Sequence, residues 1–368
     1  MPVQGSVDPH LPDPGRLGQQ GRPGPGRPAG QSSGPRPIHA LFQQRVAGDT
    51  ALLRLAGLRF AQAGLAAEAY ADTADQLEHV LKYVPPHSRL PIVHLSRGQN
   101  MLRERDRGVV EEFAARFAGR LSGMVVHDKS DMSTEAGSLV AALTELGMRL
   151  ARWPNGPSLF LEYAAGHEPG WFVEVAERLK DVDRVSCCID VGHVGIRQAG
   201  ARFAREHPDL SLRSLGPDDG RLPSLVADVQ DAVAEVVQDV IDMTRSIARL
   251  GKHLHFHLHD GHPLIGGLSD HFTFLMRLPI PFEYEGRQSL ATMYGPAGLA
   301  AIVAAAIEAC GGLDRLSFTL EIHQVEGRLP LGDAAGLFGH WRDTTNAERM
   351  NHWLSVLAQN AMLMEQNI

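Results

Sequence analysis

The sequence predicts a single (β/α)8 barrel, and three observations favour that fold. From Pro37 onward, short apolar segments alternate with longer segments of helical periodicity, and eight such pairs follow one another. Strict alternation of strands and helices is typical of a parallel sheet, and eight units favour closure into a barrel. No glycine-rich dinucleotide-binding motif follows the first strand, which counts against an open doubly wound sheet.

The expected strands are short runs of apolar and β-branched residues. In chain order they are 38–42, 66–71, 90–95, 123–127, 158–163, 185–191, 253–259 and 317–322. The expected helices carry apolar residues at helical spacing, and several have capping or breaking residues at their ends, such as Thr50, Gly64 and Thr73. In chain order they are 51–63, 74–83, 104–120, 135–150, 170–179, 222–250, 296–310 and 341–366, with a long polar loop before the sixth.

Composition divides the chain into three parts. Residues 1–36 are rich in Pro, Gly and Ser and almost lack large apolar side chains, so we expect this segment to be disordered. Residues 37–330 are expected to form the barrel. Residues 331–368 are expected to form a C-terminal helical extension that packs on the barrel or joins two copies in a homo-oligomer.

Charge and cysteine content count against several classes of protein. The formal net charge is −8 and the pI is about 6.1, whereas nucleic-acid-binding proteins usually have a basic excess. The three cysteines include no C-x-x-C pair, which disfavours a disulfide framework or a zinc-thiolate site. There is neither a signal-peptide pattern nor a long apolar run, so we expect a cytoplasmic protein that makes no use of a membrane.

Titratable side chains stand at the ends of six consecutive expected strands. In a parallel β/α barrel, these carboxyl ends form the face that carries the active site. Histidines and carboxylates gathered there would repel or remain unpaired unless a cation lay among them. Such ligands suit Mn, Mg, Co, Fe or Zn, and the sequence does not choose among these divalent ions. The residues concerned are His94, His127, Glu162, Asp190, His193, His257, His259, Glu321 and His323.

The alternation of side chains along strands sharpens this prediction. In the strand 253–259, Leu254, Phe256 and Leu258 form one apolar face that suits the surrounding helices. The histidines at 255, 257 and 259 form the other face and are expected to point into the barrel. By the same rule, Glu321 points inward from the last strand.

These motifs resemble the xylose isomerase-like TIM barrel superfamily, which includes sugar phosphate isomerases and epimerases and the AP endonuclease family 2 (endonuclease IV) enzymes. The similarity spans about residues 37–325 and is carried by Cys188-Ile-Asp190-Val-Gly-His193, His257-Leu-His259-Asp260 and Leu320-Glu321. The resemblance implies that Glu162, Asp190, His257 and Glu321 hold one metal ion. It also implies that His193 lies close by, as a ligand or a substrate contact.

The first functional hypothesis is a metal-dependent sugar or polyol isomerase or epimerase of carbohydrate metabolism. Such an enzyme moves a proton next to a carbonyl, which a Lewis acid polarises. Glu162 and Glu321 would serve as both metal ligands and the catalytic acid and base, acting on a small carbohydrate-like substrate. The ketose 3-epimerases carry an Arg shortly after the metal ligand of the seventh strand, where this sequence has Pro263.

The second hypothesis is an endonuclease IV-like zinc phosphodiesterase. His94 and His127 occupy the strands that supply histidine ligands in that family, which binds three zinc ions. Asp270 and His271 are adjacent here, whereas the family has an Asp-x-His pair in the same loop. A shortage of Lys and Arg in the loops after the last two strands, together with the acidic charge, makes nucleic acid an unlikely substrate.

Two further hypotheses remain open: a lyase or dehydratase acting on another small molecule, and a non-catalytic binding protein. Secondary features fit any of these. Asp260 is expected to orient a ligand histidine from behind or to cap a loop, and Lys129 to contact a carbonyl or a phosphate or to lie in solvent. The long segment 261–295 is expected to cover the barrel mouth as a lid, or to pack against the outer wall.

Overall fold

A computed structural model describes residues 38–42, 49–215, 219–264, 271–275, 279–284, 287–290, 293–322 and 347–368. The predicted residues Asp270 and His323 and the segment 1–36 lie outside these ranges. Among the described residues, no helix combines the length and apolar character needed to cross a bilayer.

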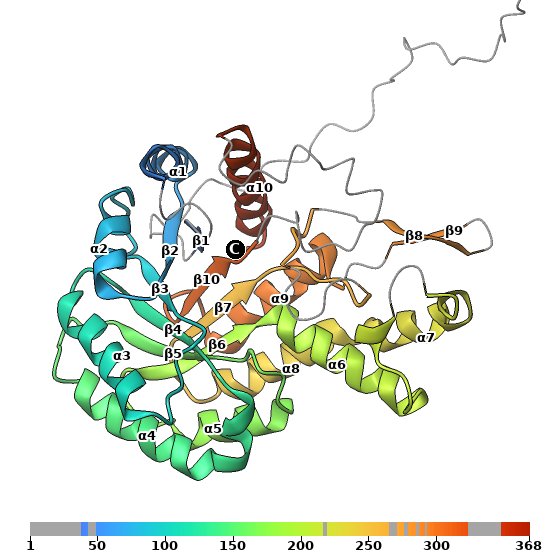
Figure 1. Ribbon diagram of the computed structural model, residues 1–368, viewed down its shortest axis with the longest axis horizontal. Coiled ribbons are helices and arrows are strands. Elements are labelled where there is room, and N and C mark those ends of the chain that lie inside the picture. The colour runs from blue at the N-terminus through green and yellow to red at the C-terminus, as the bar shows by residue number, and fades with distance from the viewer. Residues whose placement is uncertain are drawn as a thin grey trace, which may run out of the picture. The chain divides into compact units, whose positions relative to one another are not determined.

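Eight parallel strands close into a barrel, as the sequence predicts (Figure 1). Their order around the barrel is β1-β10-β7-β6-β5-β4-β3-β2. Each barrel strand therefore pairs with the barrel strands that precede and follow it in the chain, and β1 closes on β10. The strands are β1 (Ile38–Leu41), β2 (Ala66–Ala71), β3 (Ile92–Leu95), β4 (Gly123–His127), β5 (Ser158–Glu162), β6 (Val185–Asp190), β7 (Leu254–Leu258) and β10 (Leu316–Leu320).

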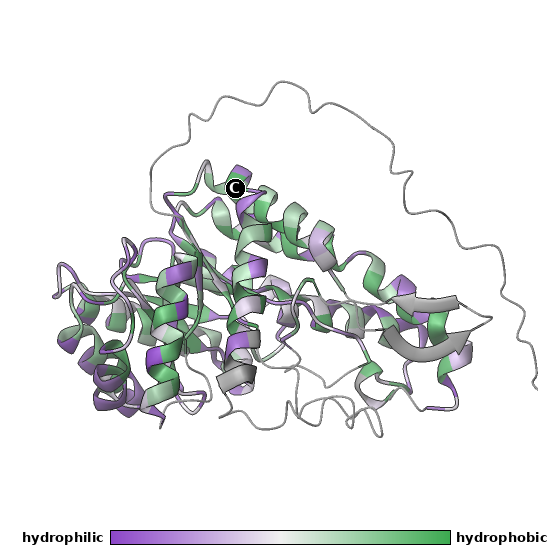
Figure 2. Cartoon of the chain, turned by 90° about the horizontal axis from the view of Figure 1, so that it is seen from above, coloured by the Kyte–Doolittle hydropathy of each residue, from purple (hydrophilic) through white to green (hydrophobic). Residues whose placement is uncertain are grey.

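Helices surround the strands, with both hydrophilic and hydrophobic residues along them (Figure 2). Local sequence fixes several of their ends. Asp49, rather than the expected Thr50, caps the first helix by accepting hydrogen bonds from the backbone N–H groups of Ala51 and Leu52. The helix ends at Gly64, whose φ of 64° suits a residue without Cβ. The helices are α1 (Thr50–Ala63), α2 (Ala74–Leu81), α3 (Glu104–Arg116), α4 (Ala136–Leu150), α5 (Pro169–Arg178), α6 (Val191–Glu206), α7 (Leu222–Ala234), α8 (Val236–Ala248), α9 (Gly295–Cys310) and α10 (Ala347–Glu365).

The hydrophobic core lies mainly between the barrel and its helices. The outward face of β7 contributes Leu254, Phe256 and Leu258 to this core, which confirms the predicted alternation. The barrel interior holds a much smaller apolar cluster of Ile92, Val125, Phe160 and Cys188. The rest of the interior is occupied by buried polar residues from the inner faces of the strands.

The region between β6 and β7 differs from the expectation. The predicted polar loop begins with a helix, α6, whose first turn is capped by the carboxylate of Asp190. Two glycines in that turn lower its helix propensity, which conceals the helix in the sequence. The expected long helix is instead two helices, α7 and α8, which meet at Glu235.

The segment after β7 contains a hairpin that the sequence did not reveal, made of β8 (Pro279–Tyr284) and β9 (Arg287–Leu290).

The predicted C-terminal helix exists as α10 and contacts α1, α9 and β10. The indole N–H of Trp353 donates to the backbone oxygen of Ile322 at 2.8 Å. Asn360 bonds the hydroxyl of Thr273 and the backbone N–H of Phe274. The tail helix therefore fastens the end of β10 and the loop that carries His271.

Candidate metal centre

Strand register brings the predicted ligands together at one end of the barrel. His127 on β4 pairs with Glu162 on β5, and Asp190 on β6 pairs with His257 on β7. Glu321 follows β10 and continues the ladder, because its backbone N–H donates to the oxygen of Leu258. Since paired residues of parallel strands point to the same side, these side chains meet inside the barrel mouth.

The four principal predicted ligands form one group. Glu162, Asp190, His257 and Glu321 each offer an atom within 4.8 Å of the others, and all four are buried. The Nδ1 atom of His257 lies 3.0 Å from Oε2 of Glu321 and 3.6 Å from Oε2 of Glu162. We call these four residues the central group.

Two histidines flank the central group on the side of Glu162. The Nε2 atom of His94 is 2.9 Å from Oε2 of Glu162, and that of His127 is 3.3 Å from the same oxygen. The two Nε2 atoms are 3.1 Å apart. Both rings therefore direct a nitrogen at one point beside the carboxylate, and we call His94, His127 and Glu162 the first flanking group.

A second flanking group lies on the side of Asp190 and consists of Asp190, His193, His259 and His271. The Nε2 atom of His259 is 2.9 Å from Oδ1 of Asp190, and Nδ1 of His193 is 3.2 Å from Oδ2. The rings of His259 and His271 stack with their centroids 4.0 Å apart. The sequence predicts that His259 points into the barrel, but it is not among the ligands that the family resemblance implies.

The donor atoms of these groups fit a divalent cation. Within the part of the chain that the structure describes, Nδ1 of His257 and Oδ2 of Asp190 are fully buried and have no hydrogen-bonding partner of good geometry. Such atoms are costly to bury unless something else satisfies them. Histidine nitrogens and carboxylate oxygens at these spacings are the ligands that transition metals and zinc take in proteins.

Electrostatics support the same interpretation. Burial would raise the pKa of Glu162, but the charges of His127 and His257 outweigh it and hold the pKa well below its ordinary value. Burial likewise would raise the pKa of Glu321, which His257 and His271 hold well below normal. Burial lowers the pKa of His127 to about 3 and that of His271 to about 4. Burial would lower the pKa values of His94, His257 and His259, but nearby anionic groups outweigh it and raise them, that of His259 to about 9. A bound cation would displace the protons of these rings, because metal ligands must be deprotonated.

Asp260 lies close to the second flanking group and acts through the backbone. Its carboxylate accepts hydrogen bonds from the backbone N–H groups of Gly261, Tyr294 and Gly295, at 2.8, 3.1 and 2.7 Å. Its backbone oxygen, not its carboxylate, lies 3.0 Å from Nδ1 of His259. Asp260 thus joins the loop after β7 to the start of α9, and its main chain turns Nε2 of His259 toward Asp190.

Steric constraints explain why the motif Asp190-Val-Gly-His193 has a glycine at position 192. A Cβ atom on Gly192 would lie 1.9 Å from Cε1 of the His259 ring, a distance that no side chain tolerates. The ring and the first turn of α6 therefore approach closely only because residue 192 lacks a side chain.

Gly192→Ala is accordingly expected to displace His259 from Asp190. It should lower the free energy of unfolding by about 1–3 kcal/mol, as overpacking does, and reduce the metal content of the second flanking group. Urea denaturation and elemental analysis measure the two effects. Gly200→Ala is the matched control in the same helix, because a Cβ there has no neighbour within 4 Å. Equal behaviour of the two variants would contradict this account.

Two residues that the sequence did not single out, and one that it predicted to face the interior, also line the site. Glu68 and Tyr70 project inward from β2, and His255 from β7, all below or beside the central group. The Tyr70 hydroxyl donates to Oε1 of Glu321, and its ring stacks on His94 at 4.5 Å. Glu68 is bonded to both His255 and His257. The sequence did not indicate that the glutamate and the tyrosine in the alanine-rich segment Ala66–Ala71 line the site. Period-two alternation shows which residues share a face of a strand, but not which face the barrel encloses.

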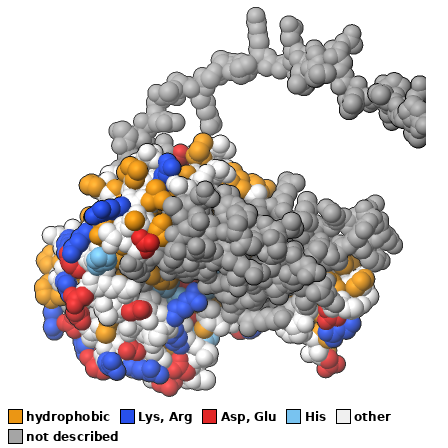
Figure 3. Space-filling model, turned by 45° about the horizontal axis from the view of Figure 1, so that its top comes forward, with side chains coloured by type: hydrophobic (Ala, Val, Ile, Leu, Met, Phe, Trp, Pro, Cys, Tyr) orange, Lys and Arg blue, Asp and Glu red, His pale blue; other side chains and the backbone are white. Residues whose placement is uncertain are grey.

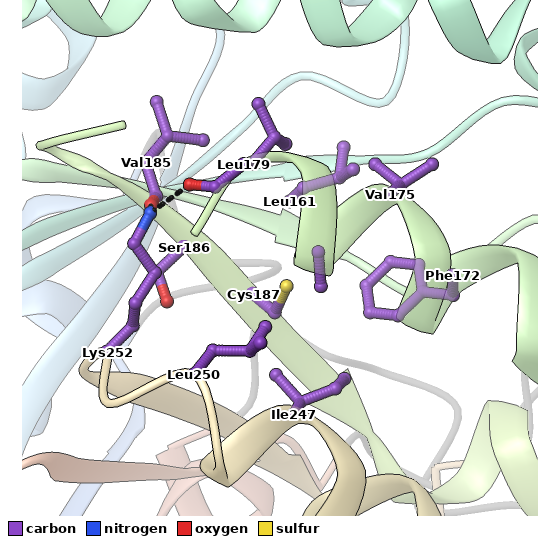
Figure 4. A pocket seen from close by; sticks show the side chains of 11 residues that line it. Leu161, Phe172, Val175, Leu179, Val185, Ser186, Cys187, Ile247, Leu250 and Lys252 are labelled. Atoms are coloured by element: carbon purple, nitrogen blue, oxygen red, sulfur yellow. Dashed lines mark hydrogen bonds between the residues drawn. The ribbon is translucent and has the colours of Figure 1, made fainter. Parts of the chain in front are cut away.

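A small apolar cavity lies elsewhere and has no part in this centre. It is lined by residues such as Leu161, Phe172 and Cys187 between the barrel wall and its helices (Figure 4). At its edge, the Nζ atom of Lys252 donates to the backbone oxygens of Leu179, Val182 and Val185. Lys252 precedes β7 and Val185 begins β6, so this cavity lies toward the amino ends of the strands.

Comparison with protein-family models and with curated proteins finds no match for the chain. The geometry shows a TIM barrel whose buried His, Glu and Asp clusters could hold metal ions.

Proposed function

We propose that the chain is a metal-dependent hydrolase of phosphate esters whose centre holds more than one divalent ion. One observation carries the proposal. Glu162 belongs to both the central and the first flanking group, and Asp190 belongs to both the central and the second. Carboxylates shared between neighbouring ligand groups are suited to bridging adjacent ions, as in multinuclear hydrolytic sites.

Each group has a distinct role in this proposal. The central group would hold one ion, and the flanking groups would hold others on either side of it. When bound, close divalent ions polarise a phosphoryl oxygen and lower the pKa of a water molecule. The chain's own contribution is to orient the ligands. Asp190 and Asp260 hold His259, and Tyr70 holds Glu321, so that the donor atoms converge before substrate arrives.

Two basic side chains lie near the first flanking group, beside the acidic Asp128 and Asp131. Lys129 follows β4 and donates from Nζ to the backbone oxygen of Arg97, and the charge of Arg97 acts on His127. These two cations lie where an anionic substrate would approach the histidine pair, which favours a phosphate ester over an uncharged sugar.

We propose a small, carbohydrate-like phosphate ester as the substrate rather than nucleic acid. The net charge of −8 disfavours a polyanionic partner. On the described part of the face in Figure 3, basic and acidic side chains are interspersed. A nucleic-acid-binding surface would be expected to carry a continuous basic stripe.

The sugar isomerase or epimerase is the second candidate. It is favoured by the completeness of the central group, in which two glutamates, from β5 and from the end of β10, share one histidine and one aspartate. That group would suffice to hold a single ion, with Glu162 and Glu321 also acting as base and acid. Under this alternative, the flanking histidines would contact the substrate.

Metal content tests the two candidates. The protein is purified without added metal, and Zn, Mn, Fe, Co and Mg are counted per chain by elemental analysis. Hydrolysis of p-nitrophenyl phosphate and bis(p-nitrophenyl) phosphate is then measured. The proposal expects two or three ions per chain and hydrolysis that a chelator abolishes. One ion per chain without hydrolysis would favour the isomerase, and a chain that binds no divalent ion would overturn both.

A further inference from the structure

Glu68 lies inside the barrel, on β2, directly beneath the central group. Its side chain is completely buried. Oε1 lies 3.0 Å from Nε2 of His257, and Oε2 lies 3.2 Å from Nε2 of His255 and 2.5 Å from the hydroxyl of Thr319. Three donors converge on this group from β7 and β10, which is the environment of an ionised carboxylate that only accepts hydrogen bonds.

The contact with Glu68 determines which nitrogen of His257 faces the candidate metals. Because the carboxylate accepts at Nε2, that nitrogen carries the proton. Nδ1 is then directed to the other side of the ring, where Glu162 and Glu321 lie 3.6 and 3.0 Å away. The ring cannot turn over without breaking the bond to Glu68 and leaving the buried Oε1 without a hydrogen-bond donor.

We propose that Glu68 is a positioning residue of the metal centre that acts through His257. It fixes the tautomer and the orientation of the imidazole and strengthens Nδ1 as an electron donor, as a carboxylate does behind a metal-binding histidine. This inference rests on the metal centre of the proposed function but not on the reaction carried out there.

Glu68→Gln tests this role because it keeps the shape of the side chain but removes its charge. The affinity of the chain for Zn²⁺ is measured by competition with a chromophoric chelator. We expect the tightest affinity that depends on the central group to fall about 10- to 100-fold, the range seen when such supporting carboxylates are removed. The visible absorption spectrum of the Co²⁺-substituted variant should also differ from that of the Co²⁺-substituted wild type, because this spectrum reports ligand geometry.

Thr319→Val is the matched control. It removes a hydrogen bond to the same carboxylate, from the opposite oxygen, but leaves the contact between Glu68 and His257 intact. If Glu68 served only to stabilise the barrel interior, both variants would lower thermal stability and neither would alter Zn²⁺ affinity. The positioning role expects a loss of affinity in Glu68→Gln alone.

A double-mutant cycle with His257→Gln shows whether the effect passes through that histidine. In the His257→Gln background, Glu68→Gln should change Zn²⁺ affinity by less than about twofold. If Glu68→Gln does not fold, Glu68→Asp retains the charge but draws it back from His257, and it should also weaken Zn²⁺ binding.

Unchanged affinity in a folded Glu68 variant, or an equal loss in both backgrounds, would overturn the inference. A loss of affinity in a chain that hydrolyses no phosphate ester would leave the inference standing and remove the proposed reaction instead.

Discussion

Glu162→Gln is expected to empty two ligand groups at once and to lower turnover by about 10³-fold or more, since close metal ions contribute several kcal/mol to such reactions. The reason is that Oε2 of Glu162 contacts Nε2 of His94 and Nε2 of His127 on one side and lies near Nδ1 of His257 on the other. A neutral amide cannot bridge two cations. Elemental analysis should therefore find the ions of the central and first flanking groups missing, while those bound by Asp190, His193, His259 and His271 remain.

Glu168→Gln provides the control for this substitution. Glu168 lies in the loop that follows β5, with its side chain 69% exposed, and pairs with Arg197. An exposed ion pair contributes little, so this variant should keep the full metal content and near-normal turnover. A Glu162→Gln protein with unaltered metal content would refute the bridging role.

Glu321→Gln is expected to lower turnover by about 10³-fold. It should release one ion rather than two, because Glu321 belongs to the central group alone. Oε2 of Glu321 lies 3.0 Å from Nδ1 of His257, closer than Oε2 of Glu162 at 3.6 Å, so its charge would contribute to holding the central ion. Turnover and metal content of the purified variant are measured together. Near-normal turnover would refute both candidate functions, since each assigns Glu321 an essential role.

Tyr70→Phe separates the charge of Glu321 from its orientation. The substitution removes the hydroxyl that donates to Oε1 of Glu321 but retains the ring that stacks on His94. Removal of such a supporting hydrogen bond costs about 10- to 100-fold in activity or metal affinity. The variant should therefore retain its ions and show an intermediate rate. A loss as complete as that of Glu321→Gln would assign the hydroxyl a more direct part in the reaction.

Much of the centre could be predicted from the sequence, because barrel topology places the carboxyl ends of all strands on one face. His94, His127, Glu162, Asp190 and His257 each stand at or near the end of a strand, and the structure brings all of them together. Alternation along β7 also predicted which of its residues face the interior. These inferences needed only the order and period of the elements.

Glu68 and α6 were not predictable in this way. A glutamate within Ala66–Ala71 resembles a solvated residue of a weak edge strand. It is buried because β2 lies between β1 and β3 and the sheet closes into a barrel around the inward-facing side chain. Glycines at the start of α6 lower its helix propensity. Only the structure shows that Gly192 is needed there, because a Cβ atom at this position would collide with the ring of His259.

The sequence by itself determined the barrel, its strand order and the inventory of histidines and carboxylates at its mouth, because these follow from local periodicity and topology. The tertiary structure alone decided which ligands are shared. Glu162 and Asp190 each serve two groups because side chains from neighbouring and opposite strands converge on the same oxygens. That convergence depends on strand register and barrel closure, which bring together residues as far apart in the chain as Glu68 and His257.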